Sequence, residues 1–219
     1  MQRSIIPLGQ CVMQTKVPLE IFNTLNETYD KNFKSLSPAN KQLVGKIKNE
    51  HSLYYSGVNS DKQTSHNFLS QYVLDWFLSV YTEYLNFKKI IPMEMKISSI
   101  WVNEMKDNEY NPIHIHQGSL FTGLSSVMIL KLPSHYGKEY SADDQPCNGR
   151  LQIIGNSSGQ FASTDYQPQL EVGDFYIFPY DMRHTVYPFN STNETRRTLA
   201  ANCDIKYDEV RYRGARSPA

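Results

Sequence analysis

The stretch NPIHIHQGSLFTGLSSVMILKLP, residues 111–133, decides how the rest of the chain is interpreted. It places His114 and His116 two positions apart, immediately before a long apolar run. On an extended strand, residues i and i+2 project to the same face. The two imidazoles therefore point together at a metal, at a substrate or at solvent. An isolated H-x-H pair favours solvent, so the assignment depends on other parts of the chain.

A third histidine, His184, lies in a similar context downstream. The stretch GDFYIFPYDMR, residues 173–183, predicts a turn at 172–174 and a strand over 175–178, and His184 then opens another strand. A jelly roll can bring such a strand start back beside an earlier strand. Two imidazoles from one strand and one from a distant strand can then bind a first-row metal, and imidazole suits Fe(II), Zn(II) and Ni(II) equally.

The segment NETRRTLAANCDI, residues 193–205, carries two arginines into a pattern that alternates like a strand. One face takes Arg196, Thr198, Ala200 and Asn202, and the other takes Arg197, Leu199 and Ala201. One arginine must therefore face inward beside small residues, where an unpaired guanidinium is costly. An inward arginine with a threonine two residues later suits the two-point binding of a ligand carboxylate. Space, a cation and a histidine cluster together indicate a bound small acid.

The order of these motifs resembles the iron(II)- and 2-oxoglutarate-dependent oxygenases, and most of all their prolyl-hydroxylase-like branch with phage and marine bacterial members. The resemblance covers Trp101 to Ile205 and rests on WVNEM, NPIHIHQGS, GDFYIFP and RRTLAAN. It implies Fe(II) as the metal, with 2-oxoglutarate and O2 as co-substrates. It also implies hydroxylation of a protein prolyl residue or a small molecule, with release of succinate and CO2.

The resemblance assigns roles to individual residues. His184 matches the distal histidine of the family, and Arg196 matches the arginine that binds the far carboxylate of 2-oxoglutarate. Thr198 matches the hydroxyl of the family's R-x-S/T pattern, and Arg197 replaces Arg196 if the strand register shifts by one residue. Tyr176 is a further candidate for contact with the co-substrate, although an aromatic residue in GDFYIFP is more often part of a core.

The first motif departs from the family, which has H-x-D or H-x-E where this chain has His116. Either His114 and His116 both bind the metal with His184, or only one binds and a carboxylate completes the set. The neighbouring candidate carboxylates are Asp107, Glu109 and Asp181. A site of three histidines carries one more positive charge than the usual site, which would weaken metal retention or alter the oxygen chemistry.

Two other functions remain open on the sequence. One is a cupin-like module whose histidines hold a metal without turnover, and the other is a three-histidine dioxygenase that does not use 2-oxoglutarate. An arginine at 196 or 197 that points into the cavity favours a dicarboxylate co-substrate, and two that point to solvent favour the binding module. The remaining histidines, His51, His66 and His135, lie in polar or helical contexts and are expected at the surface.

The hydrophobic pattern predicts a mainly β fold with N-terminal helices. Short apolar runs separated by turns over residues 92–207 predict a double-stranded β-helix, or jelly roll, and residues 1–16 one or two strands including IIPL. Residues 18–90 read as a helical support region that covers one sheet, with a polar insertion at 34–66 read as loop and turn. The whole chain, 1–219, is expected to form a single domain.

Two helices are expected in the support region. The first begins near Pro18, and Ile21, Leu25 and Tyr29 follow at helical spacing. The second lies within residues 65–89 and is the stronger prediction of the two. Its apolar face is assigned to Phe68, Tyr72, Val73, Trp76, Phe77 and Tyr81.

Composition narrows the range of partners. The 219 residues include 22 Lys+Arg and 22 Asp+Glu, a balance that argues against a nucleic-acid partner. The mean hydropathy of −0.52 and the lack of a long apolar run argue against a membrane span. No secretory signal is recognised at the N-terminus, and three separated cysteines form no C-x-x-C pair. We therefore expect a cytoplasmic protein, or one of the host cytoplasm if a phage encodes it.

Overall fold

The computed structural model describes residues 9–39, 43–57, 65–156, 159–160, 162–190 and 193–208. The helices are α1 (Leu19–Asn32), the short 3-10 helix η1 (Phe33–Ser35) and α2 (Gln71–Phe87). The strands are β1 (Met13–Lys16), β2 (Ser37–Pro38), β3 (Asn49–Tyr55), β4 (His66–Asn67), β5 (Pro92–Met105), β6 (Asn111–His114), β7 (Gly123–Lys131), β8 (Leu151–Ile154), β9 (Asp165–Tyr166), β10 (Asp174–Pro179), β11 (Arg183–Val186) and β12 (Arg196–Tyr207).

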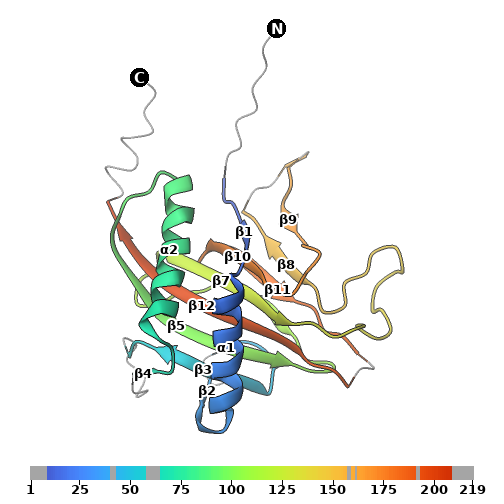
Figure 1. Ribbon diagram of the computed structural model, residues 1–219. Coiled ribbons are helices and arrows are strands. Elements are labelled where there is room, and N and C mark those ends of the chain that lie inside the picture. The colour runs from blue at the N-terminus through green and yellow to red at the C-terminus, as the bar shows by residue number, and fades with distance from the viewer. Residues whose placement is uncertain are drawn as a thin grey trace.

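These strands form two antiparallel sheets, the arrangement of the predicted double-stranded β-helix (Figure 1). The larger sheet has the order β1-β10-β7-β12-β5-β3-β2, with β4 paired to β3. The smaller sheet has the order β6-β11-β8-β9. The longest pairing joins β12 to β5, from Arg196 opposite Met105 to Tyr207 opposite Pro92. The chain thus returns at its end to the centre of the larger sheet, as a jelly roll requires.

Each strand of the larger sheet serves two apolar layers because its side chains alternate between faces. On β12, Leu199 and Ala201 belong to the layer under the helices. On β10, Tyr176 and Phe178 belong to the layer between the two sheets. The helices cover the first layer and the smaller sheet covers the second.

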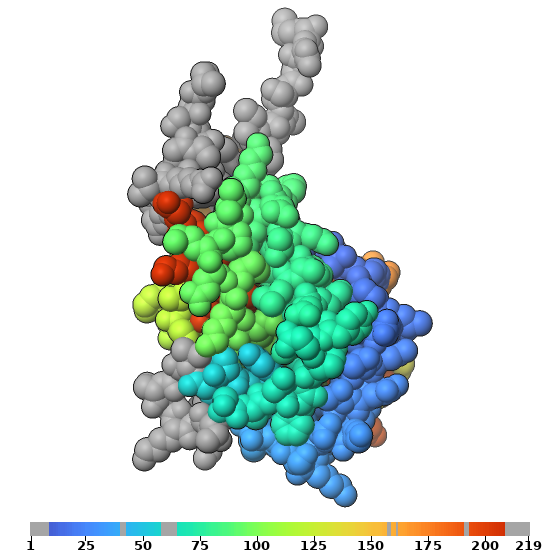
Figure 2. All heavy atoms as spheres, turned by 60° about the vertical axis from the view of Figure 1, so that its left-hand side comes forward, coloured from blue at the N-terminus to red at the C-terminus, as the bar shows by residue number. Residues whose placement is uncertain are grey.

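The helices cover the outer face of the larger sheet, as expected. In α1, Ile21, Leu25 and Tyr29 are all completely buried, which confirms their predicted spacing. Figure 2 shows the two helices side by side over this face, α1 in blue and α2 in green. None of the helices in the described part of the chain is long and apolar enough to cross a membrane.

The predicted apolar face of α2 is only partly correct. Val73, Phe77 and Tyr81 are buried, but Tyr72 is 56% exposed and its hydroxyl bonds to Glu20 of α1. The helix begins at Gln71 because the Ser70 hydroxyl caps it by accepting a hydrogen bond from the amide of Val73. Phe68 therefore lies before the helix and not on its face.

The polar insertion is not the loop that we expected. Residues 49–55 form β3, which pairs along β5 and extends the larger sheet. Glu50 and Ser52 lie on the cavity face of this strand, and Asn49, His51 and Leu53 lie on the other. Neither face has a continuous apolar stripe, so the sequence pattern does not indicate a strand. Residues 40–42 and 58–64 of this insertion lie outside the described part, as does the IIPL segment before β1.

Candidate metal centre and co-substrate pocket

A cavity of about 330 Å³ opens between the two sheets and contains all three predicted histidines. Its walls come from β3, β5 and β12 of the larger sheet and from β6, β8 and β11 of the smaller one. The described lining residues used below are Glu50, Ser52, Trp101, Asn103, His114, His116, His184, Thr198, Ala200 and Asn202. Of the two small residues that the sequence indicated as leaving space, Ala200 lines the cavity and Ala201 lies in the layer under the helices.

The structure brings His114, His116 and His184 together. One nitrogen from each ring lies within 4.8 Å of the other two, and the Nε2 atoms of His116 and His184 are 3.1 Å apart. The meeting depends on strand pairing, because His184 of β11 lies directly opposite His114 of β6. The jelly-roll return predicted for His184 is therefore present.

The loop after β6 is anchored so that His116 faces the same point. The amide of His116 donates to the carbonyl of Tyr180 at 3.0 Å. The Tyr180 hydroxyl and the amide of Ser119 both donate to the carboxylate of Asp204, at 3.1 and 2.9 Å. A Cβ at Gly118 would lie 1.8 Å from that carboxylate, so only glycine lets the loop approach Asp204.

Backbone carbonyls fix the protonation of two of the rings. The Nδ1 of His114 lies 2.7 Å from the carbonyl of Pro112, and the Nδ1 of His184 lies 3.1 Å from that of Met182. A carbonyl only accepts, so each Nδ1 carries the hydrogen and each Nε2 keeps its lone pair for a metal. Burial lowers the pKa of His184 to about 3, with the nearby His114 adding to the effect, so the ring is neutral at pH 7.

Asn202 holds the third ring. Its side-chain nitrogen lies 3.3 Å from Nδ1 of His116, and its side-chain oxygen is buried without a partner. Turning the amide by half a turn exchanges these atoms, so that the oxygen accepts a hydrogen bond from Nδ1–H of His116 and gains its missing partner. This orientation leaves the Nε2 lone pair of His116 free, as on the other two rings.

The carboxylates considered for the metal site are engaged elsewhere. Glu109 accepts hydrogen bonds from the amides of Lys106 and Lys48. Asp107 and Asp181 bond to neighbouring side chains at the surface. Within the described ranges, the group of possible metal ligands contains the three histidines and no carboxylate.

The two arginines face opposite sides of β12. Arg197 forms salt bridges with Glu104 and Asp30 on the helix side, so the fallback residue points away from the cavity. Arg196 lies on the side of Thr198, is 2% exposed, and leaves its Nε and Nη2 without a hydrogen-bond partner. It is not itself among the described residues that line the cavity. Burial lowers the pKa of Arg196, and the Tyr136 hydroxyl beside it acts in the opposite direction. The sequence carried no signal for Tyr136, which lies in a turn-rich stretch.

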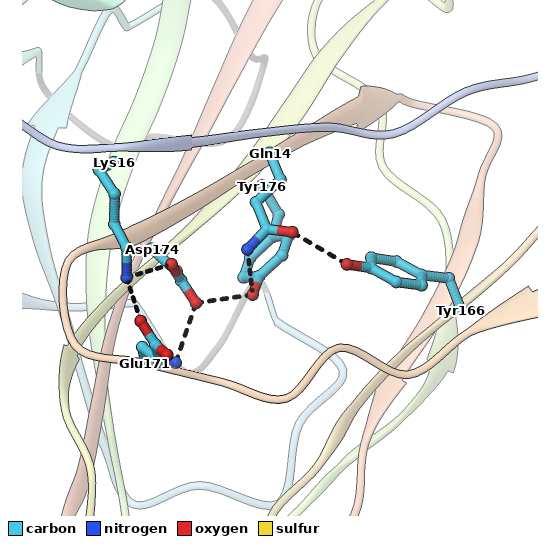
Figure 3. Close-up of polar contacts among 6 residues, drawn as sticks. All are labelled: Gln14, Lys16, Tyr166, Glu171, Asp174 and Tyr176. Atoms are coloured by element: carbon cyan, nitrogen blue, oxygen red, sulfur yellow. Dashed lines mark hydrogen bonds and ion pairs between the residues drawn. The ribbon is translucent and has the colours of Figure 1, made fainter.

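Tyr176 is not a cavity residue among those described. Its hydroxyl donates to Asp174 at 2.8 Å and lies 3.3 Å from the amide nitrogen of Gln14 (Figure 3). Lys16 forms a salt bridge with the same Asp174. These contacts tie β10 to the edge strand β1, and the co-substrate contact considered for Tyr176 stays a prediction.

Two of the histidines expected at the surface are half-buried. His51 packs against the rings of Tyr29 and Phe33, and burial lowers its pKa. His66 lies 2.8 Å from the hydroxyl of Ser52. The expectation was wrong for both because the insertion containing them joins the larger sheet. It is confirmed for His135, which is exposed.

Comparison with known proteins finds a similar family over just under half of the chain. Residues 99–202, which include every histidine of the site, match a family described as "Putative 2OG-Fe(II) oxygenase". Over this region the chain is similar to the 2OG-Fe(II) oxygenases. The cofactors of this superfamily are Fe(II) and 2-oxoglutarate, and the three-histidine group fits iron. Its nitrogen donors are neutral and face one point, although the usual carboxylate is missing.

Solved structures support the fold. A prolyl hydroxylase from Trichoplax adhaerens, in complex with a hypoxia inducible factor peptide, has 12% identity and a TM-score of 0.52, covering 96% of this chain and 88% of its own. AviO1 from Streptomyces viridochromogenes Tue57 has 12% identity and a TM-score of 0.52, covering 96% and 92%. The epimerase SnoN of nogalamycin biosynthesis has 10% identity and a TM-score of 0.53, covering 89% and 76%. No curated protein matches the sequence.

Proposed function

We propose that this chain is an active Fe(II)- and 2-oxoglutarate-dependent dioxygenase that hydroxylates a C–H bond of a protein or small-molecule substrate. His114, His116 and His184 would hold the iron through their Nε2 atoms. Bound iron supplies the one-electron chemistry that couples O2 reduction to decarboxylation of 2-oxoglutarate and oxidation of the substrate. Hydroxylation is favoured over other outcomes by the resemblance to prolyl hydroxylases, and a prolyl residue is accordingly one candidate target.

The observation that supports this proposal most is Arg196, which is buried with two of its nitrogens unpaired and Tyr136 as a hydrogen-bond partner. A buried guanidinium without a charged partner is strongly unfavourable, so a position that retains one is suited to an anionic ligand. The side chain has two unpaired nitrogen positions, and Thr198 lies next along the same face. A carboxylate accepts hydrogen bonds from both positions, as in two-point arginine–carboxylate pairs. We assign Arg196 and Thr198 to the far carboxylate of 2-oxoglutarate.

The other site residues would position the reactants. Asn202 would hold the ring of His116 by accepting its Nδ1–H, and the carbonyls of Pro112 and Met182 would do the same for the other two histidines. The apolar layer around the cavity would exclude water from the reacting atoms. Arg196 also argues against the cupin-like module and the three-histidine dioxygenase without 2-oxoglutarate, because neither alternative needs a buried cation.

The decisive experiment adds Fe(II) and 2-oxoglutarate without oxygen and records the weak visible absorption band of bound 2-oxoglutarate. Oxygen is then admitted and succinate is measured. We expect Arg196→Ala to raise the 2-oxoglutarate concentration needed for the band at least tenfold, a loss of about 1.4 kcal/mol, with iron binding unchanged. Arg197→Ala is the matched control and should leave that concentration unchanged. A wild-type protein that binds iron but gives neither band nor succinate contradicts the proposal.

A further inference from the structure

Glu50 is a buried carboxylate that the proposed chemistry does not use. It is completely inaccessible to solvent, it lines the cavity, and neither of its carboxylate oxygens has a hydrogen-bond partner. Burial raises its pKa to about 7, and the nearby Glu109 adds to the rise. A group in this state lowers the stability of the fold, so its place in a cavity wall calls for a ligand.

The position of Glu50 follows from the register of the larger sheet. Glu50 on β3 lies opposite Asn103 on β5, and Asn103 lies opposite Thr198 on β12. All three line the cavity. Because neighbouring strands are about 4.8 Å apart, Glu50 lies roughly 10 Å from Thr198, which we assign to the 2-oxoglutarate side. Glu50 therefore lies at one end of the row Glu50–Asn103–Thr198, and the co-substrate carboxylate is assigned to the other end. At this distance the repulsion between the two negative charges is small.

The atoms around Glu50 match a particular kind of ligand group. The side-chain oxygen of Asn103 is also buried without a partner, which gives three unpaired acceptors with the two oxygens of Glu50. An ammonium or guanidinium group offers several donors and no acceptor, whereas a hydroxyl offers one donor. No lysine or arginine is present among the described residues that line the cavity.

Trp101 connects this corner with the metal centre. It lies two residues before Asn103 on the same face of β5, and the centroid of its ring is 5.9 Å from that of His116. The face of a tryptophan attracts cations. A ligand held by Glu50 would thus lie beside the histidines and not at a remote site.

We propose that Glu50, with Asn103 and Trp101, forms a substrate subsite for a protonated amine or guanidinium group. This inference rests on the proposed function, because it assumes that the metal and 2-oxoglutarate fill the other end of the cavity. The substrate would be an amine-bearing small molecule, or a peptide that inserts a basic side chain, and its oxidised carbon would lie a short distance from the cation.

The test uses n-butylammonium as the probe, with n-butanol as its neutral match. Wild-type protein is loaded with Mn(II), a redox-stable substitute for Fe(II), and with 2-oxoglutarate, and the relaxation of the probe's protons by Mn(II) is measured by NMR. We expect n-butylammonium to bind at least roughly tenfold more tightly than n-butanol, since hydrogen bonds to charged groups are the stronger ones. Glu50→Gln should remove this preference, and Glu50→Asp should keep part of it.

Glu104→Gln is the matched control, because Glu104 of β5 pairs with Arg197 on the opposite face of the sheet. It should leave n-butylammonium binding unchanged. The inference is overturned if n-butylammonium does not bind wild type, if n-butanol binds equally well, or if Glu50→Gln keeps the preference. The relaxation of the 2-oxoglutarate protons, recorded in the same samples, reports separately on the proposed function.

Discussion

The Nε2 atoms of His116 and His184 lie 3.1 Å apart, although the two residues are separated by 68 positions in the chain. Two nitrogen ligands at right angles around a metal, each about 2.1 Å from it, would be about 3 Å apart. The spacing of these two rings therefore fits shared coordination of one ion. Both rings are held from behind, one by a backbone carbonyl and one by Asn202, which limits their movement when no metal is bound.

Removal of one histidine should abolish high-affinity metal binding. We expect His184→Ala to weaken Fe(II) binding at least 100-fold in anaerobic titration, because two imidazoles remain and no described carboxylate is grouped with them. His135→Ala, at an exposed histidine, should bind iron as wild type does. If His184→Ala retains wild-type affinity, a ligand other than these histidines completes the site.

The contact between Asn202 and His116 should tune the metal affinity. Asn202→Leu removes the acceptor for Nδ1–H of His116 and should weaken Fe(II) binding by roughly 10- to 100-fold. Asn202→Asp keeps an acceptor at the same place and should bind iron at least as tightly as wild type. The affinities can be measured by competition with a chelator of known strength. Equal affinities for the two variants would mean that the contact has no role in holding the ring.

Glu50 should make the stability of the ligand-free protein depend on pH. Its pKa is raised in the folded state to about 7 from 4.5, so the folded protein holds a proton that the unfolded chain has released between these pH values. Stability from this group is full below about pH 4.5 and is lost as pH rises to 7, by up to about 3 kcal/mol. The difference in free energy of unfolding between wild type and Glu50→Gln isolates this loss from the titration of the histidines. A difference that stays constant from pH 4.5 to 8 would show that Glu50 titrates normally.

Tyr176 should matter for stability and not for 2-oxoglutarate. Tyr176→Phe removes the hydroxyl that donates to Asp174, and we expect a loss of about 1 kcal/mol in urea unfolding. The 2-oxoglutarate concentration that gives half of the visible band should not change. A large change in that concentration with normal stability would restore the co-substrate role considered from the sequence.

Local patterns were sufficient for much of the fold and for the selection of the three histidines that cluster. The alternation of apolar residues over 92–207 predicted the jelly roll, because burial of one strand face leaves a period of two in the sequence. The same alternation placed Arg196 and Arg197 on opposite faces of one strand. The order of H-x-H, His184 and R-x-T indicated the same family that matches residues 99–202, and the phage or marine bacterial origin stays a prediction.

The sequence by itself determined the candidate histidines and the placement of Arg196 and Arg197 on opposite faces of one strand. Both depend only on residue type and on alternation within that strand. Only the tertiary structure decided that His184 pairs opposite His114, that no described carboxylate joins them, and that Glu50 is buried. These outcomes depend on the register between strands far apart in the chain, which is set by the packing of the whole domain. The local sequence around Glu50 is compatible both with a solvent-exposed loop and with a cavity wall. Only the pairing of β3 with β5 decides between them.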